Sequence, residues 1–196
     1  MAERIRVGVL ISGRGSNMIA LAEHKRREER AYDIALVASN MPEARGLVAA
    51  RRLGLPVWAQ SHAGMERAAF DRLLDDVLRQ HEVEIVALAG YMRLLSPEFV
   101  ERWPGRILNI HPSLLPLYPG VDTHRRALLA GDEHGGCSVH IVTDELDAGP
   151  VIARARVRIL PRDDGASLAE RVLQEEHRLY PAALDGYCRA LQEEAG

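Results

Sequence analysis

The stretch Leu108-Asn109-Ile110-His111-Pro112-Ser113-Leu114-Leu115-Pro116 joins a short apolar run to a loop bounded by prolines. We expect the apolar run to be a β-strand, and because alternate residues of a strand share a face, Asn109 and His111 should point the same way. Pro112 disfavours helical backbone at His111, so the histidine should end the strand. An amide donor beside an imidazole can stabilise an oxyanion and move a proton. From these residues alone, a catalytic pair and a polar strand end both remain open.

Upstream of this stretch, apolar runs alternate with helical patterns. Ile5 to Ile11 is almost continuously apolar, which is typical of a central parallel strand buried on both faces. The sequence predicts further strands at 34–38, 56–58 and 84–89, and helices that open at Met18, cover 42–53 and 65–80, and open again at Ser96. Strands alternating with helices indicate a doubly wound, mostly parallel, Rossmann-like sheet. Ligands of such sheets bind beyond the carboxyl ends of the strands, where loops at Gly13 and Met92 would lie near His111.

Downstream of the stretch, the hydrophobic pattern changes to period two. In residues 137–143 and 151–159, apolar and polar side chains alternate, which is typical of half-buried antiparallel strands. A short helix is expected at 123–130. Ser167 and Glu170 form a capping box that should start the last helix, which Pro181 should kink or divide. The expected fold class is therefore α/β, with a single domain over residues 1–196 and antiparallel strands in its C-terminal part.

The loop Ser12-Gly13-Arg14-Gly15-Ser16-Asn17 connects the first strand to its helix. A dinucleotide fingerprint would need glycine at Met18, and no acidic residue follows the second strand, so NAD is not expected. A P-loop would need a Gly-Lys-Ser/Thr ending, which is absent. The loop suits one phosphate, with Ser16 or Asn17 capping the helix or donating to that phosphate. A plain tight turn remains the alternative.

Four histidines, His111, His124, His134 and His140, fall within thirty residues. None has the HExxH spacing, and the two cysteines make no zinc-ligand pair, so no metal is expected. A histidine and an aspartate such as Asp147 suit general acid–base catalysis if the fold brings them together. Sequence spacing alone cannot establish that contact, and Asp147 in an Asp-Ala-Gly turn also reads as an ordinary turn residue.

Composition favours an ordinary globular protein. Of its 196 residues, 47% are hydrophobic and 27% charged, and the net charge is −3. The basic triplet Lys25-Arg26-Arg27 is interpreted as a solvated helix face, so neither nucleic acid nor a membrane is an expected partner. The N-terminus lacks the pattern of a signal peptide and the cysteines form no framework, which favours the cytoplasm. Monomer and homodimer remain open.

Four motifs occur in a characteristic order. They are Ser12–Asn17, the segment from Ala89 to Ser96, Asn109–Pro116, and Ser138-Val139-His140 with Asp147-Ala148-Gly149-Pro150. From about Arg6 to Tyr187 the chain resembles the phosphoribosylglycinamide formyltransferases, folate-dependent enzymes of purine synthesis within the wider formyltransferase family. The histidine–proline motif alone would indicate only the wider family. The SGRGSN loop makes the resemblance specific to the phosphoribosylglycinamide formyltransferases.

The resemblance implies direct formyl transfer from 10-formyltetrahydrofolate to the amino group of 5′-phosphoribosylglycinamide, without metal or NAD. The residue matching Asn109 stabilises the tetrahedral oxyanion, and that matching His111 handles the proton. The residue matching Asp147 orients the histidine and stabilises its protonated form, with His140 in support. Positions that match ribonucleotide contacts are Gly13, Gly15, Ser16, Asn17, Met18 and Glu176. Positions that match folate contacts are Arg67, Met92, Arg93, Leu94, Leu95 and Asn109. Leu117 and Leu173 depart from the pattern, which puts any substrate contact there in doubt.

Three alternative functions predict other features of the chain. A 10-formyltetrahydrofolate hydrolase would be expected to carry an N-terminal regulatory domain before the strand at Ile5. A transfer-RNA formyltransferase would be expected to carry a basic C-terminal domain beyond Gly196. A non-enzymatic phosphoribosyl- or nucleotide-binding regulator would leave Asn109, His111 and Asp147 without a joint purpose.

Overall fold

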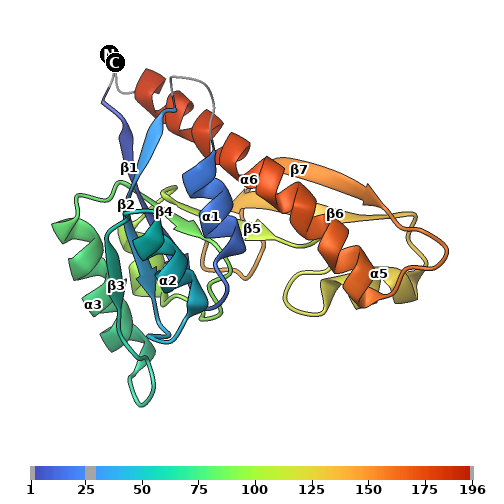
Figure 1. The fold of residues 1–196 in the computed structure, drawn as a ribbon, viewed down its shortest axis with the longest axis horizontal. Helices are drawn as coiled ribbons and strands as arrows, with labels where there is room; N and C mark the ends of the chain where they lie inside the picture. The colour runs from blue at the N-terminus through green and yellow to red at the C-terminus, as the bar shows by residue number, and fades with distance from the viewer. Residues whose placement is uncertain (1–2, 25–29, 195–196) are drawn as a thin grey trace.

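The computed structural model describes residues 3–24 and 30–194, so the Lys25-Arg26-Arg27 triplet lies outside the described residues. A seven-stranded sheet in the order β3-β2-β1-β4-β5-β6-β7 forms its centre (Figure 1). The strands are β1 (Ile5–Ile11), β2 (Tyr32–Ser39), β3 (Val57–Ala59), β4 (Ile85–Leu88), β5 (Ile107–His111), β6 (His134–Ile141) and β7 (Val151–Arg158). The first five pair in parallel, whereas β6 and β7 are antiparallel. The predicted fold class is confirmed.

Helices cover both faces of this sheet (Figure 1). They are α1 (Ser16–Glu23), α2 (Arg45–Arg52), α3 (Arg67–Gln80), α4 (Pro97–Arg102), α5 (Thr123–Ala130) and α6 (Gly165–Glu194). Helices α1, α2 and α6 share one apolar core, which includes Met18, Leu47 and Leu184. Helices α3 and α4 share the other, which includes Phe70 and Phe99. Both faces of the parallel strands are thus buried, as their continuous apolar runs require.

The strand order reverses between β1 and β4, and this reversal positions the site. The chain leaves β1 toward β2 on one side and leaves β4 toward β5 on the other. The loops that follow β1 and β4 therefore diverge and leave a crevice at the carboxyl edge, which is where ligands bind in open α/β sheets. His111 ends β5, the next strand along, as predicted.

The long helix α6 corrects the predicted cap and excludes one of the two effects predicted for Pro181. It begins at Gly165, and Asp164 and Ser167 make the reciprocal bonds of its cap, with the Ser167 amide donating to Asp164 Oδ1 over 2.8 Å and the Asp164 amide to Ser167 Oγ over 3.0 Å. The capping box predicted at Ser167 and Glu170 is therefore wrong, because the aspartate three residues earlier is the stronger cap. Nor does Pro181 divide the helix, which continues to Glu194.

Tyr180 anchors α6 to the sheet next to this proline. Its side chain is fully buried, and its hydroxyl lies 3.1 Å from the Leu88 carbonyl of β4 and 3.0 Å from the Leu108 carbonyl of the neighbouring strand β5. Burial raises the pKa of this phenol far above its usual value, so it remains a hydrogen-bond donor. Tertiary packing thus holds the helix together where Pro181 removes a backbone donor.

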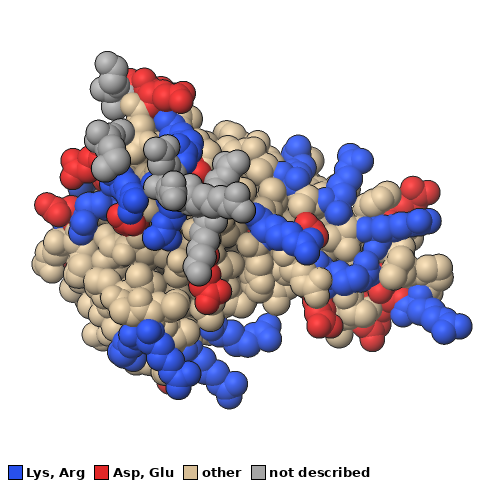
Figure 2. All heavy atoms as spheres, turned by 45° about the horizontal axis from the view of Figure 1, so that its top comes forward, with Lys and Arg blue, Asp and Glu red and all other residues tan. Residues whose placement is uncertain are grey.

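The β6 strand begins at His134, three residues before the predicted start at Cys137. Gly135 and Gly136 lie among these first residues of β6. Because glycine has no side chain, the alternation of apolar and polar residues does not reveal that the strand begins here. On the face shown in Figure 2, basic and acidic side chains are interspersed. One such pair is Arg178 and Glu175 of α6. Within residues 3–24 and 30–194, no helix is both long enough and apolar enough to cross a membrane.

Candidate active site

Asn109 and His111 lie on one face of β5, and β6 brings His140 beside them. The antiparallel register pairs Asn109 with His140, and Asn109 Nδ2 lies 3.2 Å from His140 Nε2. His140 Nδ1 lies 3.1 Å from the Ile141 carbonyl, an acceptor that requires a proton on Nδ1. Nε2 has two possible partners: in a neutral ring it accepts from the Asn109 amide and fixes its orientation, whereas in a protonated ring it donates to Asp147. The second proton on Asn109 Nδ2 remains available to a ligand.

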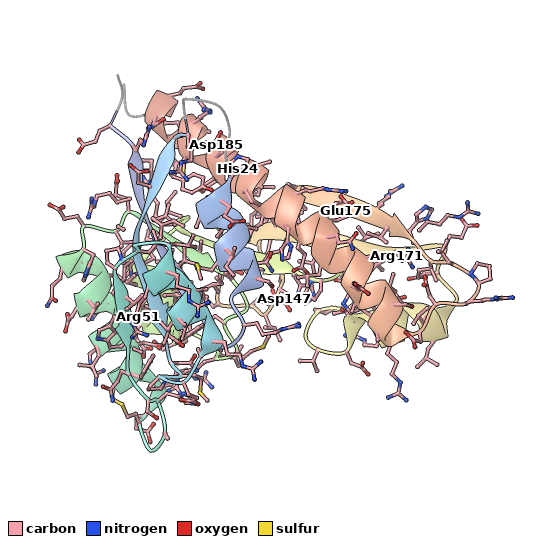
Figure 3. All side chains as sticks on the ribbon, in the orientation of Figure 1. His24, Arg51, Asp147, Arg171, Glu175 and Asp185 are labelled. Atoms are coloured by element: carbon pink, nitrogen blue, oxygen red, sulfur yellow. The ribbon has the colours of Figure 1, made fainter. Side chains whose placement is uncertain are left out.

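Asp147 comes from the turn between β6 and β7 and completes this group (Figure 3). Its Oδ2 lies 3.4 Å from His111 Nδ1, and its Oδ1 lies 3.6 Å from His140 Nε2. Asp147 adopts a left-handed backbone with φ of 53°, and a Cβ at Gly149 would collide with the Ile141 carbonyl. The turn is therefore sterically specified, and it brings together the two residues whose contact sequence spacing could not establish.

Burial and charge compete at Asp147. Its side chain is only 8% exposed, and this burial by itself would raise the pKa of the carboxyl. Contact with His140, a hydrogen bond from the Gly120 amide and the charge of His111 outweigh burial, so the pKa of Asp147 lies below its usual value. The site therefore holds a buried, ionised carboxylate between two histidines.

His111 also contacts main-chain groups that sequence reasoning missed. Its Nε2 lies 3.0 Å from the Tyr118 carbonyl, and the Gly120 amide donates to Asp147 Oδ2 over 2.8 Å. Both ring nitrogens of His111 thus face oxygen acceptors, an arrangement that only the protonated imidazolium satisfies completely. The Tyr-Pro-Gly turn was visible in the sequence, but its main-chain contacts leave no pattern in side-chain types.

The glycine loop contributes main-chain groups to the same edge. Gly15 is the N-terminal cap residue of α1 with φ of 73°, and no side chain caps the helix. Ser16 and Asn17 therefore do not cap it, and donation to a phosphate stays the other role predicted for them. Met18 is fully buried in the core, which leaves its main chain as the part that faces the loop. The first amides of a helix lack intrahelical acceptors, and here they follow directly on Gly13 and Gly15.

Asn17 instead connects the loop to α6. Its Nδ2 donates to Glu176 Oε2 over 2.7 Å, and both residues are buried. Burial raises the pKa of Glu176, an effect that the hydrogen bond from Asn17 reduces without reversing. Two predicted ribonucleotide residues that are far apart in sequence are thereby brought together.

The predicted folate segment, residues 92–95, begins beside the glycine loop. Ser12 Oγ accepts from the Met92 amide over 2.8 Å and lies 2.6 Å from Asn40 Oδ1. Ser12 and the buried Asn40 are thus positioning groups that sequence reasoning did not assign. Leu95 packs against the core beneath α3 and α4.

This segment presents apolar and cationic groups together. Met92 and Leu94 are 81% and 54% exposed, which is unusual for apolar side chains next to a crevice. The Arg93 guanidinium lies 5.2 Å from the Phe70 ring centroid, and Arg67 is exposed at the start of α3. Such a surface suits a ligand with an apolar ring system and an anionic end. Within the described part of the chain, no three His, Cys, Asp or Glu side chains are grouped to hold a metal ion.

The fold and these polar groups define the class: an α/β enzyme with a histidine–aspartate centre at the carboxyl edge of its sheet, one strand away from the switch point. Residues 5–184 match the family described as "Formyl transferase". The chain belongs to the formyl transferase family.

Individual members of the family are similar to this chain over most of its length. The chain is 43% identical over 184 residues to phosphoribosylglycinamide formyltransferase of Escherichia coli K12, covering 93% of this chain and 87% of that protein. It is 45% identical over 184 residues to the trifunctional purine biosynthetic protein adenosine-3 of Drosophila melanogaster, covering 92% of this chain but only 14% of the length of that protein. The crystal structure of phosphoribosylglycinamide formyltransferase from Brucella melitensis is similar, with a TM-score of 0.91, 44% identity and coverage of 95% of this chain and 96% of that one.

Proposed function

We propose that this chain transfers the formyl group of 10-formyltetrahydrofolate to the amino group of 5′-phosphoribosylglycinamide in purine biosynthesis. One observation carries the proposal: Asn109, His111 and Asp147 form one polar centre at the carboxyl edge of the sheet, the edge at which the glycine loop contacts residue 92. The names of the E. coli and B. melitensis relatives support the same reaction. We further infer one cytoplasmic catalytic domain over residues 1–196, as a monomer or a homodimer.

The chemistry follows from the geometry of the centre. The substrate amine attacks the formyl carbon, which becomes tetrahedral. The formyl oxygen becomes an oxyanion and accepts a hydrogen bond from the second N–H of the Asn109 amide. The amine nitrogen then loses a proton, N10 of the folate gains one, and the C–N10 bond breaks. His111 carries that proton, and the ionised Asp147 orients His111 and stabilises its protonated form. His140 acts through Asn109, whose amide it orients.

The ribonucleotide would lie along the glycine loop. Its phosphate accepts from the main-chain amides at the start of α1, at Ser16, Asn17 and Met18, and Gly13 and Gly15 permit a close approach. Glu176 faces the glycinamide group, where a carboxylate attracts the amine, and Asn17 holds Glu176 in place.

The folate would lie against residues 92–95. Met92, Leu94 and Leu95 offer apolar surface to its ring system, and Arg67 and Arg93 offer charge to its carboxylates. Asn109 borders both ligands. A 10-formyltetrahydrofolate hydrolase and a non-enzymatic regulator are not favoured by the relatives found.

A mass-spectrometric assay with both substrates, run with and without the ribonucleotide, tests the proposal. We expect formylated ribonucleotide with wild type and none with His111→Ala, whereas the exposed His134 provides a matched control, His134→Ala, that keeps activity. Formate released without the ribonucleotide would identify a hydrolase instead. Ribonucleotide binding without any turnover would identify a regulator.

A further inference from the structure

Residues 118–120 contact both members of the His111–Asp147 pair. The Tyr118 carbonyl accepts from His111 Nε2 over 3.0 Å, and the Gly120 amide donates to Asp147 Oδ2 over 2.8 Å. His111 Nδ1 and Asp147 Oδ2 lie 3.4 Å apart between these two contacts. The position of this three-residue segment therefore sets the distance and angle between imidazole and carboxylate.

Side chains at α5 anchor the segment from outside. The Tyr118 hydroxyl lies 2.7 Å from Asp132 Oδ2, just beyond the left-handed Gly131 that ends the helix. The Arg126 guanidinium lies 5.3 Å from the Tyr118 ring centroid, and its Nη1 donates to the Pro119 carbonyl over 2.6 Å. Tyr118 is thus held by two contacts from α5 and its C-terminal end: its hydroxyl donates to Asp132, and its ring faces the Arg126 cation.

The backbone of Tyr118 requires such anchoring. Its φ of 55° lies in the left-handed region, which is unfavourable for a bulky side chain. A residue persists there only when its surroundings determine its conformation, and such residues concentrate at functional sites. The left-handed backbone at Tyr118 precedes the turn in which the Gly120 amide reaches Asp147.

We propose that Tyr118 is a positioning residue, held by Asp132 and Arg126, that sets the geometry of the His111–Asp147 pair for proton transfer. This inference rests on the proposed formyl transfer, because it assigns a role within that reaction. Asp132 and Arg126 act on the pair through residues 118–120. Proton transfer depends steeply on donor–acceptor geometry, whereas substrate binding depends on groups elsewhere in the crevice. Loosening the anchor should therefore slow turnover and leave binding in place.

Tyr118→Phe is the direct test, because it removes the hydroxyl and keeps the ring under Arg126. We expect kcat to fall about 5–10-fold while KM for both substrates changes less than about two-fold. Tyr187→Phe is the matched control, since the Tyr187 hydroxyl donates to the Gly105 carbonyl over 2.6 Å away from the centre. This control should lose a similar hydrogen bond and keep kcat.

Two variants of Asp132 separate positioning from general stability. Asp132→Asn keeps an oxygen that accepts from Tyr118, so its kcat should lie well above that of Asp132→Ala. The double variant Tyr118→Phe/Asp132→Ala should be no slower than the slower single variant, because both changes remove the same contact.

The outcomes are distinguishable. Wild-type kcat in Tyr118→Phe, or equal losses in Tyr118→Phe and Tyr187→Phe, would overturn the inference and leave the proposed function standing. A rise in KM that matches the fall in kcat would also overturn it. Wild-type protein that fails to formylate the ribonucleotide would overturn the proposed function itself.

Discussion

Asn109 on β5 and His140 on β6 stand directly opposite each other in the antiparallel register, with Asn109 Nδ2 3.2 Å from His140 Nε2. The β6–β7 pairing shifts register between Val139 and His140, and such irregularities re-aim side chains next to active sites. One proton of the Asn109 amide is thereby committed to a histidine and the other is directed to a ligand.

Replacement of this amide should affect the transition state and spare binding. We expect Asn109→Ala to lower kcat by about 10²–10³-fold, the typical cost of losing an oxyanion donor, and to leave the ribonucleotide Kd within about three-fold. Steady-state kinetics and calorimetric titration measure the two quantities. If turnover in Asn109→Ala equals that of wild type, Asn109 is no oxyanion donor.

Asp147 should couple stability to pH. Its pKa is lowered in the folded state, so the ionised form stabilises the fold above the usual aspartate pKa, and this contribution is lost as pH falls through the lowered value. We expect the Tm of wild type to decrease more on acidification than that of Asp147→Asn. The exposed Asp144 in the same turn gives a matched control, and Asp144→Asn should follow wild type. Parallel Tm curves for Asp147→Asn and wild type would contradict the assignment.

Glu176 should affect the pH dependence of stability in the opposite direction. Burial raises its pKa, so the folded state disfavours its ionised form and stability falls as pH rises through the usual carboxyl range. Glu176→Gln should therefore raise Tm at pH 8, with a smaller gain at pH 4, and should raise KM for the ribonucleotide. Glu175→Gln, next to it and paired with Arg178, is the control that should change neither quantity appreciably. A Tm gain that does not depend on pH would indicate a packing effect instead.

Gly46 on α2 should be required for the shape of the glycine loop. Its amide donates to the Gly13 carbonyl over 2.9 Å, and a Cβ at Gly46 would lie 3.0 Å from Gly15 Cα and 2.6 Å from a methyl group of Ile11. We expect Gly46→Ala to raise KM for the ribonucleotide about ten-fold with little change in KM for the folate, because the loop must move. Gly186→Ala is the matched helical control, since nothing lies within 4 Å of its added Cβ. Equal kinetics in both variants would exclude this role of Gly46.

Sequence reasoning predicted the fold well where side chains carry the signal. The apolar run from Ile5 to Ile11 is β1 itself, and the predicted helix at 123–130 is α5 itself. The start of β6 was missed because Gly135 and Gly136 have no side chains to alternate. The cap of α6 was misplaced because two overlapping capping patterns, at Asp164 and at Ser167, compete in the sequence.

The candidate site was predictable in its residues more than in its contacts. Asn109 and His111 could be placed on one face from strand geometry alone. The contact between His111 and Asp147 depends on the register shift at His140 and on the left-handed turn at Asp147, neither of which the alternating pattern of these strands reveals. The Tyr118 carbonyl and the Gly120 amide act through the main chain, so their positions became visible only in three dimensions.

The attachment of α6 by Tyr180 has a consequence for insertions and deletions. Glu176 precedes Tyr180 by four residues, which places both on the same side of the helix, one toward Asn17 and the other toward main-chain carbonyls of β4 and β5. Removing one residue between them would rotate Glu176 by about 100° relative to the sheet. The same rotation would move the buried side chains of Leu168 and Val172, so both the packing of the helix and the direction of the carboxylate would be lost. Chain length between these two positions is therefore as strictly constrained as the identity of the acidic residue itself.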